Sequence, residues 1–233
     1  MISLRRAAER GTTRIDWLDS RHTFSFGGYR DPRFVGFHDL LVINEDKVRP
    51  GAGFPTHPHR DMEIISYVVD GALAHRDSLG TGSVIRPGEV QRMSAGTGIR
   101  HSEFNASTDE AVHFLQIWIT PERPDLDPGY EQVTLPPVDG ASQLDLIGGP
   151  AGGSQAVTIH QDVTLWRASL KPGETMRHPL AAGRAAWVQV VHGHARVNGC
   201  EMAAGDGLGM EGEPEVTMTG TDEAELLIFD LRR

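Results

Sequence analysis

The chain is arranged around one stretch, which opens with Gly53-Phe-Pro-Thr-His57-Pro-His59-Arg-Asp-Met-Glu63 and closes with Gly96-Thr-Gly98-Ile-Arg-His101-Ser-Glu103. Alternate side chains of a β-strand share one face, so His57 and His59 are expected to point the same way, as are His101 and Glu103 on a second strand. Two such strands facing each other would bring all four side chains to one point. Three imidazoles and one carboxylate suit a divalent transition metal, and this mixed donor set leaves positions for solvent or substrate. The stretch therefore predicts a catalytic metal site with ligands His57, His59, His101 and Glu103.

A single His-X-His pair is weak evidence for a metal, because surface strands carry histidines by chance and buried histidines are usually hydrogen-bonded. The second pair strengthens the prediction, since ligands occur as clusters of suitable residue types. His113 is a further candidate, because alternation along its strand does not fix which face it takes. His22 could reach a pocket, but a polar surface position is expected for it, and His38 is expected to be structural.

The composition excludes several classes of protein. A formal net charge of -10 and the lack of a sizeable Lys/Arg cluster argue against direct binding to nucleic acid. The lone Cys200 excludes an intrachain disulfide and fits a reducing compartment, with burial as a small apolar residue as its expected role. The first residues carry charges where a signal peptide needs an apolar core, and no later run approaches membrane-spanning length. We expect a cytoplasmic protein that makes no membrane contact.

The pattern of turns indicates an all-β fold. The 27 glycines and 14 prolines are spread along the chain, which is typical of short strands joined by turns. Strands are predicted at 37–44, 64–69 and 112–119, and Asp70-Gly71 is a strong hairpin signal. A small antiparallel barrel would bring the two ligand pairs together in space.

A proline-rich polar break at 121–134 predicts a linker between a metal-binding domain at 1–120 and a second domain at 135–233. The second domain carries a strand-turn-strand rhythm like that of the first, which indicates duplication. Setting Val190 opposite Val68 places Pro179 and Ala181 opposite the first two histidines, and no histidine follows His194 to stand opposite His101. We therefore expect the second domain to be a metal-free copy.

With these residues in view, the chain resembles the pirin family of bicupins, and most closely its bacterial members described as quercetin 2,3-dioxygenases. The resemblance covers nearly the whole chain and rests on five segments, at residues 19–27, 44–46, 53–63, 92–103 and 226–231. It implies two tandem cupin barrels, which are double-stranded β-helices of the jelly-roll type. It also implies that the iron ligands of the family fall on His57, His59, His101 and Glu103. Iron is the expected metal, with nickel, cobalt, manganese, copper or zinc as alternatives.

Two departures from the general cupin pattern accompany this resemblance. Glu63 is the counterpart of a carboxylate that many cupins use as a ligand, whereas pirin-like proteins take their carboxylate from the second motif. Glu63 is therefore expected to support the site, and whether it reaches the metal stays open. The second motif has Gly96-Thr-Gly98 without the proline that usually precedes its glycine.

The resemblance implies a metal-dependent dioxygenase that opens the heterocycle of quercetin, or of a related enolisable phenolic, at the 2,3 bond and releases carbon monoxide. Its partners would be a flavonol-like small molecule and O2, with Glu103 as the catalytic proton acceptor. One alternative is a non-enzymatic iron-binding redox sensor that acts through protein partners. Another is a metalloenzyme whose true substrate is a different phenolic compound, because specificity depends on pocket walls that the sequence does not place.

Overall fold

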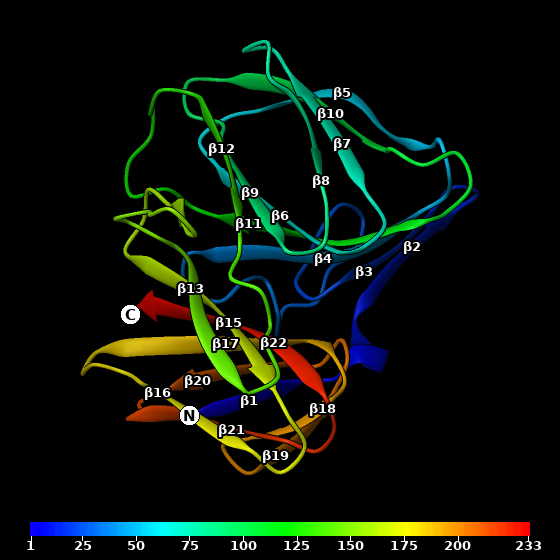
Figure 1. Ribbon diagram of the computed structural model, residues 1–233. Helices are drawn as coiled ribbons and strands as arrows, with labels where there is room; N and C mark the ends of the chain where they lie inside the picture. The colour runs from blue at the N-terminus through cyan, green and yellow to red at the C-terminus, as the bar shows by residue number, and fades with distance from the viewer.

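A computed structural model describes residues 1–233. The chain forms β-strands almost throughout, and its one helical segment is the short 3-10 turn η1 (Ala7–Glu9). The strands form two stacked barrels, each of which pairs a seven-stranded sheet with a four-stranded sheet (Figure 1). Both termini lie beside the second barrel, the lower one in Figure 1. The prediction of an all-β fold with two tandem barrels is confirmed.

The first barrel contains the predicted ligand strands. In spatial order its seven-stranded sheet consists of β12 (Gly129–Thr134), β9 (Glu89–Ser94), β6 (Glu63–Asp70), β11 (Val112–Ile119), β4 (Leu40–Val48), β3 (Leu18–His22) and β2 (Gly11–Ile15). Its four-stranded sheet consists of β5 (Gly53–His59), β10 (Ile99–Asn105), β7 (Leu73–Asp77) and β8 (Gly82–Ile85). All of these pairings are antiparallel.

The second barrel repeats this plan. Its seven-stranded sheet consists of β1 (Ile2–Arg5), β20 (Gly207–Glu211), β17 (Arg184–His192), β22 (Ala224–Arg232), β15 (Val163–Leu170), β13 (Gln143–Gly149) and β14 (Val157–Thr158). Its four-stranded sheet consists of β16 (Thr175–Pro179), β21 (Glu215–Gly220), β18 (His194–Val197) and β19 (Cys200–Ala203). Only the short β13–β14 pairing is parallel.

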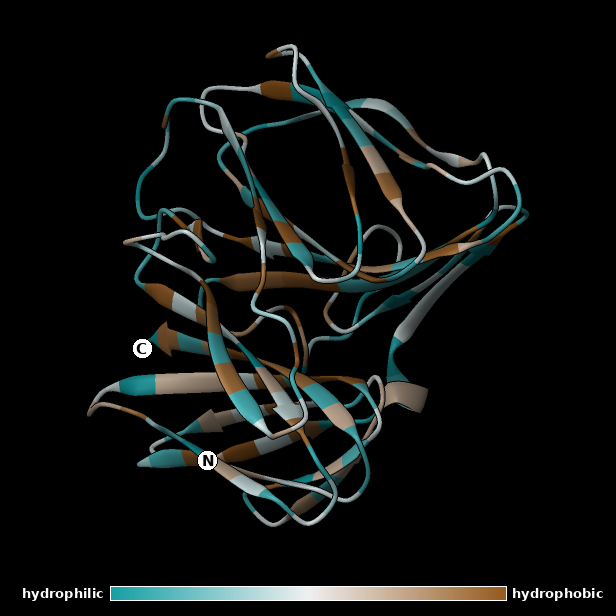
Figure 2. Ribbon diagram, viewed as in Figure 1, coloured by the Kyte–Doolittle hydropathy of each residue, from teal (hydrophilic) through white to brown (hydrophobic).

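The two seven-stranded sheets meet in the largest hydrophobic cluster of the molecule, which has 21 buried residues and includes side chains from both barrels. Phe24 packs against Trp187 there, with ring centroids 4.8 Å apart. Hydrophobic colouring follows the strands where the barrels meet (Figure 2). Burial of this much apolar surface is the main force that holds the barrels together.

Alternate side chains of β11 point to the junction between the barrels and to the interior of the first barrel. Leu115 and Ile117 belong to the cluster at the junction, whereas Phe114 belongs to a smaller cluster of the first barrel. Gln116 and Trp118 share the face of Phe114, because side chains in a strand alternate between its two faces. The first barrel therefore carries polar side chains inside, which a metal site requires.

Sheet membership crosses the predicted domain division of 1–120, 121–134 and 135–233 at two places. β1 pairs with β20 in the second barrel, and β12, which lies in the predicted linker, pairs with β9 in the first. Both additions satisfy the backbone N–H and C=O groups of a strand that would otherwise stand at the edge of a sheet. The linker is therefore partly a strand, and neither predicted domain completes its own sheets. That the two segments fold as independent domains stays a prediction.

Candidate metal centre

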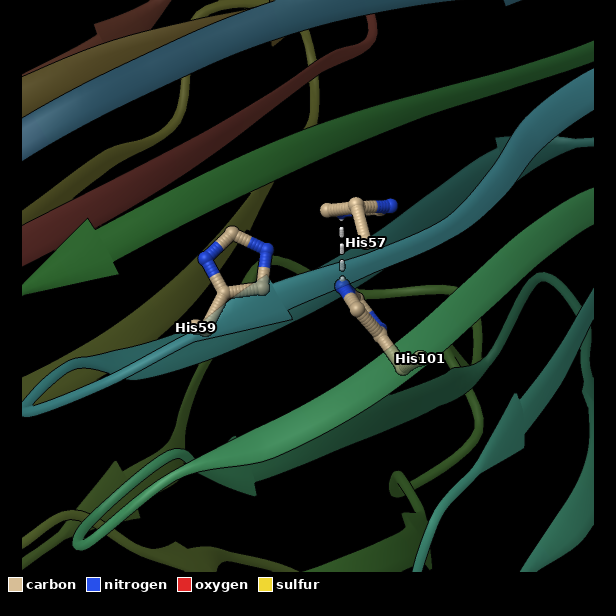
Figure 3. Close-up of side chains that lie close together, drawn as sticks. All are labelled: His57, His59 and His101. Carbon is tan, nitrogen blue, oxygen red and sulfur yellow. Dashed lines mark hydrogen bonds between the residues drawn. The ribbon is translucent and has the colours of Figure 1, made fainter.

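The pairing of β5 with β10 brings the two predicted ligand pairs together. His57 stands directly opposite His101 in this antiparallel ladder, and the register shifts between His101 and Glu103. Figure 3 shows the rings of His57, His59 and His101 turned toward one another. Gly53 permits the close approach of the strands, because a Cβ at that position would overlap the backbone carbonyl of Glu103.

The three imidazoles lie at the spacing of ligands to one ion. A ring nitrogen of each lies within 4.8 Å of one on the other two, and the Nε2 atoms of His57 and His101 are 3.1 Å apart. Two nitrogens bound to one ion at about 2.1 Å and at roughly a right angle would be about 3 Å apart. The donor set and its spacing therefore fit a divalent transition metal.

Hydrogen bonding fixes how His57 faces the cluster. Its Nδ1–H donates to the backbone carbonyl of Pro55 at 2.8 Å, so its Nε2 lone pair points at the other histidines. This is the usual arrangement of a histidine that ligates a metal through Nε2, with the second ring nitrogen held by a backbone carbonyl.

The other two histidines are held in the uncharged form that binds metals. Burial, together with the neighbouring His101 and His57, lowers the pKa of His59 to about 4. Burial likewise lowers the pKa of His101 to about 3, with His57 and His75 as the next causes. Since a protonated imidazole has no free lone pair, these low pKa values favour metal binding at neutral pH.

Two polar side chains donate hydrogen bonds to the carboxylate of Glu103. Gln116 Nε2 donates to both carboxylate oxygens, at 2.9 and 2.8 Å, and the Ser66 hydroxyl donates to Oε1 at 3.2 Å. A carboxylate oxygen of Glu103 lies within 4.8 Å of a ring nitrogen of His101 and of His75. Glu103 also lines one pocket with His57 and His59. The structure therefore brings all four predicted residues to one region of the barrel.

The pocket beside these residues has a volume of about 130 Å³ and a mixed wall. Leu18, Phe26, Phe54 and Trp118 form its apolar part. Its other lining side chains are Thr13, Ser20, His22, Asn44, Asp46 and Gln116. A second, more open hollow of about 750 Å³ adjoins it, since Phe26 and Trp118 line both. Apolar walls with a few polar groups are typical of a small-molecule site.

Glu63 and His113, the two open candidates, point away from the cluster. Glu63 Oε2 accepts hydrogen bonds from the backbone N–H of His160 at 3.1 Å and from its ring Nδ1 at 3.1 Å, which links the first barrel to a loop before β15. His113 Nε2 lies 2.9 Å from Glu45, which also pairs with Arg10. Neither belongs to a group of side chains that could hold a metal.

The expectation that His22 is a surface residue is wrong. His22 is 2 % exposed and lines the pocket, with Nδ1 2.8 Å from Asn44 Oδ1 and Nε2 2.9 Å from Thr13. The rings of Phe26 and Tyr29 lie against it, with centroids 5.3 and 6.5 Å from that of His22. His38, which we expected to be structural, bonds Glu211 of the second barrel at 3.0 Å.

Sequence reasoning missed the residues that support the site, namely Asn44, Asp46, Ser66, His75, Asp77 and Gln116. One signal was present for two of them. Ser66 and Gln116 interrupt strands that are otherwise hydrophobic, and a polar residue at an inward position needs a partner. The two face each other across β6 and β11 and both bond Glu103.

The second barrel has a different interior. The repeat places Val188 opposite Ser66, and Val188 pairs with Ile228 as Ser66 pairs with Gln116. Val188 and Ile228 both belong to the apolar cluster that fills this barrel. At these two positions the second barrel therefore lacks the polar side chains that hold Glu103 in the first. Cys200, which we expected to be buried, is half-buried and packs against the same cluster.

Comparison with known proteins agrees with this architecture. The profile of the family described as Pirin matches residues 3–119, and the profile described as Quercetinase C-terminal cupin domain matches residues 146–231. The chain is 46% identical over 231 residues to the Quercetin 2,3-dioxygenase of Escherichia coli (strain K12), covering 99% of each chain. It is 40% identical over 235 residues to the Putative quercetin 2,3-dioxygenase of Pasteurella multocida, covering 99% of this chain and 100% of the relative.

Solved structures give the same result. The crystal structure of YhhW from Escherichia coli matches with a TM-score of 0.95 at 45% identity, covering 99% of this chain and 97% of that one. A second structure, of the bacterial pirin YhhW in complex with nickel(II), matches with a TM-score of 0.94 at 44% identity, covering 100% and 99% of the two chains. The chain is thus a bicupin, and it belongs to the pirin family.

Proposed function

We propose that this protein is a metal-dependent dioxygenase that cleaves quercetin, or a related enolisable phenolic, at the 2,3 bond with release of carbon monoxide. The metal ligands in this proposal are His57, His59, His101 and Glu103. The observation that carries it is the cluster of three imidazoles beside a held carboxylate, with His57, His59 and Glu103 lining a partly apolar pocket. The names of the relatives support the reaction class, and iron is the proposed native metal.

When bound, a divalent transition metal supplies a Lewis acid and a template for the oxygens of a 3-hydroxy-4-keto substrate and for O2. The chain itself must then remove the proton of the substrate hydroxyl. Glu103 is the proposed acceptor, through Oε2, once its carboxylate loosens from the metal. That oxygen receives one hydrogen bond, from Gln116, whereas Oε1 receives two, from Gln116 and Ser66. Oε2 therefore has the greater remaining capacity to accept a proton.

The shape of the site bears on the substrate. A volume of about 130 Å³ is less than the roughly 300 to 1,000 Å³ of usual ligand pockets. The adjoining hollow of about 750 Å³ supplies the missing room. Phe26 and Trp118 stand between the two, edge to face, with ring centroids 5.5 Å apart. We therefore propose that the ring with the 3-hydroxy-4-keto group lies near the histidines. The remaining aromatic part of the substrate would then lie in the outer hollow, against Phe26 and Trp118.

The experiment supplies quercetin and O2 to protein loaded separately with iron, nickel, cobalt, manganese, copper and zinc, and follows flavonol loss and carbon monoxide together. We expect equal amounts of quercetin lost and carbon monoxide formed. His101→Ala, which removes a proposed ligand, should abolish both, while His178→Leu in the second barrel should retain them. Rates no higher than those of His101→Ala for every metal would refute the proposal.

Absence of quercetin turnover would leave two alternatives, another phenolic substrate and a redox sensor. Turnover of another phenolic would favour the same chemistry on a different substrate. Absence of any turnover, with a change in protein binding when the metal changes oxidation state, would favour the redox sensor. A cytoplasmic location stays a prediction.

A further inference from the structure

His75 and Asp77 lie behind the metal centre and take no part in the function proposed above. His75 Nε2 is 3.0 Å from Asp77 Oδ2, and both side chains are wholly buried. Asp77 is itself fixed, since its Oδ1 accepts the backbone N–H groups of Leu79 at 2.9 Å and Thr81 at 3.1 Å. A carboxylate in this position accepts the Nε2 proton of His75, so the other ring nitrogen, Nδ1, carries a lone pair.

His75 is a neighbour of the ligand strand. β7 pairs with β10 so that Asp77 stands opposite His101 and His75 opposite Glu103. The rings of His75 and His101 have centroids 5.4 Å apart, and a nitrogen of each lies within 4.8 Å of one on the other. The Nδ1 atoms of both are buried and have no hydrogen-bond partner. Two unsatisfied buried nitrogens in adjacent rings require an explanation.

The hydrogen bonds within the histidine cluster explain both atoms. His57 gives its Nδ1 proton to Pro55, so its Nε2 can only accept, and His101 must donate from Nε2 across the 3.1 Å contact. Neutral His101 then has its lone pair at Nδ1, as His75 does, and the two rings have nitrogens within 4.8 Å of each other. Two acceptors cannot bond each other, which accounts for both unpartnered atoms.

A metal ion bound at the cluster would turn Nδ1 of His101 from an acceptor into a donor. His101 can ligate through Nε2 only if its proton moves to Nδ1. Its Nδ1–H can then donate a hydrogen bond to Nδ1 of His75. An ion held by His75, His101 and Glu103 is a competing explanation for the same atoms. It would compete with the ion held by His57 and His59 for the single lone pair of neutral His101.

We propose that His75 accepts a hydrogen bond from His101 Nδ1–H in the metal-loaded protein, directly or through one water, and that Asp77 holds His75 in the accepting tautomer. Asp77, His75 and His101 thus form a chain that positions His101 and makes its Nε2 a stronger ligand. His75 and Asp77 are positioning residues that act through His101. The inference rests on the metal site proposed above but does not depend on which substrate that site uses.

The first test observes the tautomers. Nitrogen NMR of protein labelled with ¹⁵N-histidine should find His101 protonated at Nε2 without metal and at Nδ1 when loaded with zinc. His75 should carry its proton at Nε2 in both states. A loaded protein with His75 protonated at Nδ1 would overturn the proposal, as would two zinc ions per chain with His101 unprotonated at both nitrogens.

The second test uses a matched pair of variants and the affinity for nickel(II). His75→Leu removes the acceptor and should weaken binding about 10- to 100-fold. His75→Asn places an amide oxygen near the former Nδ1 and should restore most of the affinity. His178→Leu is the control, because His178 makes an equivalent buried pair with Asp230, also at 3.0 Å, in the second barrel. It should leave the affinity unchanged.

Equal affinity in wild type and His75→Leu would overturn the proposal, as would an Asn variant no better than the Leu variant. The readout also separates the two proposals. A wild-type protein that binds nickel as described but releases no carbon monoxide would count against the proposed reaction alone. Normal carbon monoxide release with no effect of His75→Leu on affinity would count against this inference alone.

Discussion

Asp46 lies in the wall of the metal pocket, where its carboxyl group is buried and Oδ1 has no partner. Burial raises the pKa of this carboxyl from 3.8 to about 7, with the negative charges of Glu103 and Glu45 as further causes. The folded protein therefore holds Asp46 protonated up to near-neutral pH. Replacement by asparagine, a neutral group of the same shape, should change how stability depends on pH.

The direction follows from the two states. As the pH rises from about 4 to about 7, the unfolded chain loses the Asp46 proton while the folded protein retains it. The unfolded state then binds fewer protons, so the contribution of Asp46 to the free energy of unfolding falls with rising pH. Each pH unit in this window removes about 1.4 kcal/mol, or about 4 kcal/mol in all. The Asp46→Asn variant does not lose this stability, because asparagine does not ionise.

The assay is urea unfolding of chelator-treated wild type and Asp46→Asn at several pH values from about 4 to about 8. The stability of Asp46→Asn relative to wild type should increase by about 4 kcal/mol across the range. Asp139→Asn, at an exposed position on a loop, is the control and should follow wild type. If the Asp46→Asn and wild-type curves stay parallel, Asp46 ionises freely in the folded protein and the reasoning is refuted.

Three further predictions concern the metal site. Gln116→Leu should lower nickel affinity about 10- to 100-fold, because Glu103 loses the donor that holds both its oxygens; titration calorimetry measures this, and unchanged affinity would contradict it. Gly53→Ala should destabilise the fold by roughly 1–3 kcal/mol in urea unfolding, and should reduce metal content, because its Cβ would push β5 away from β10; normal metal content would contradict this account. The third prediction concerns the second-barrel histidines His178, His192 and His194. Replacing all three should leave the metal content, measured by mass spectrometry, at the wild-type level. A loss of metal would show that the second barrel contributes ligands.

Local pattern was sufficient for much of the fold. The alternation at Val112–Ile119 predicted β11 with its observed bounds, and β-branched residues predicted β6 to within one residue at each end. Asp70-Gly71 forms the expected turn, where Gly71 has a φ of 79° and a Cβ would come 2.6 Å from the carbonyl oxygen of Ala111. These features depend on neighbouring residues and on strand periodicity, which a sequence displays directly.

Features that depend on distant segments could not be predicted in this way. β12 is a strand because β9 offers it an edge, and its own residues are half-exposed and polar enough to resemble a linker. Glu63 turns toward His160, which comes from a segment 97 residues further along the chain. His22 bonds Asn44, which lies 22 residues further along the chain on β4. Each of these outcomes is decided by a partner that only the assembled barrels bring into place.

If the protein is a dioxygenase, both atoms of O2 must enter its organic product. Iron-loaded protein is given quercetin under ¹⁸O2, and the product is examined by mass spectrometry. We expect both labelled atoms in the ring-opened product and none in the carbon monoxide, since its oxygen comes from the substrate hydroxyl. A product with one labelled atom or none, or labelled carbon monoxide, would contradict this expectation.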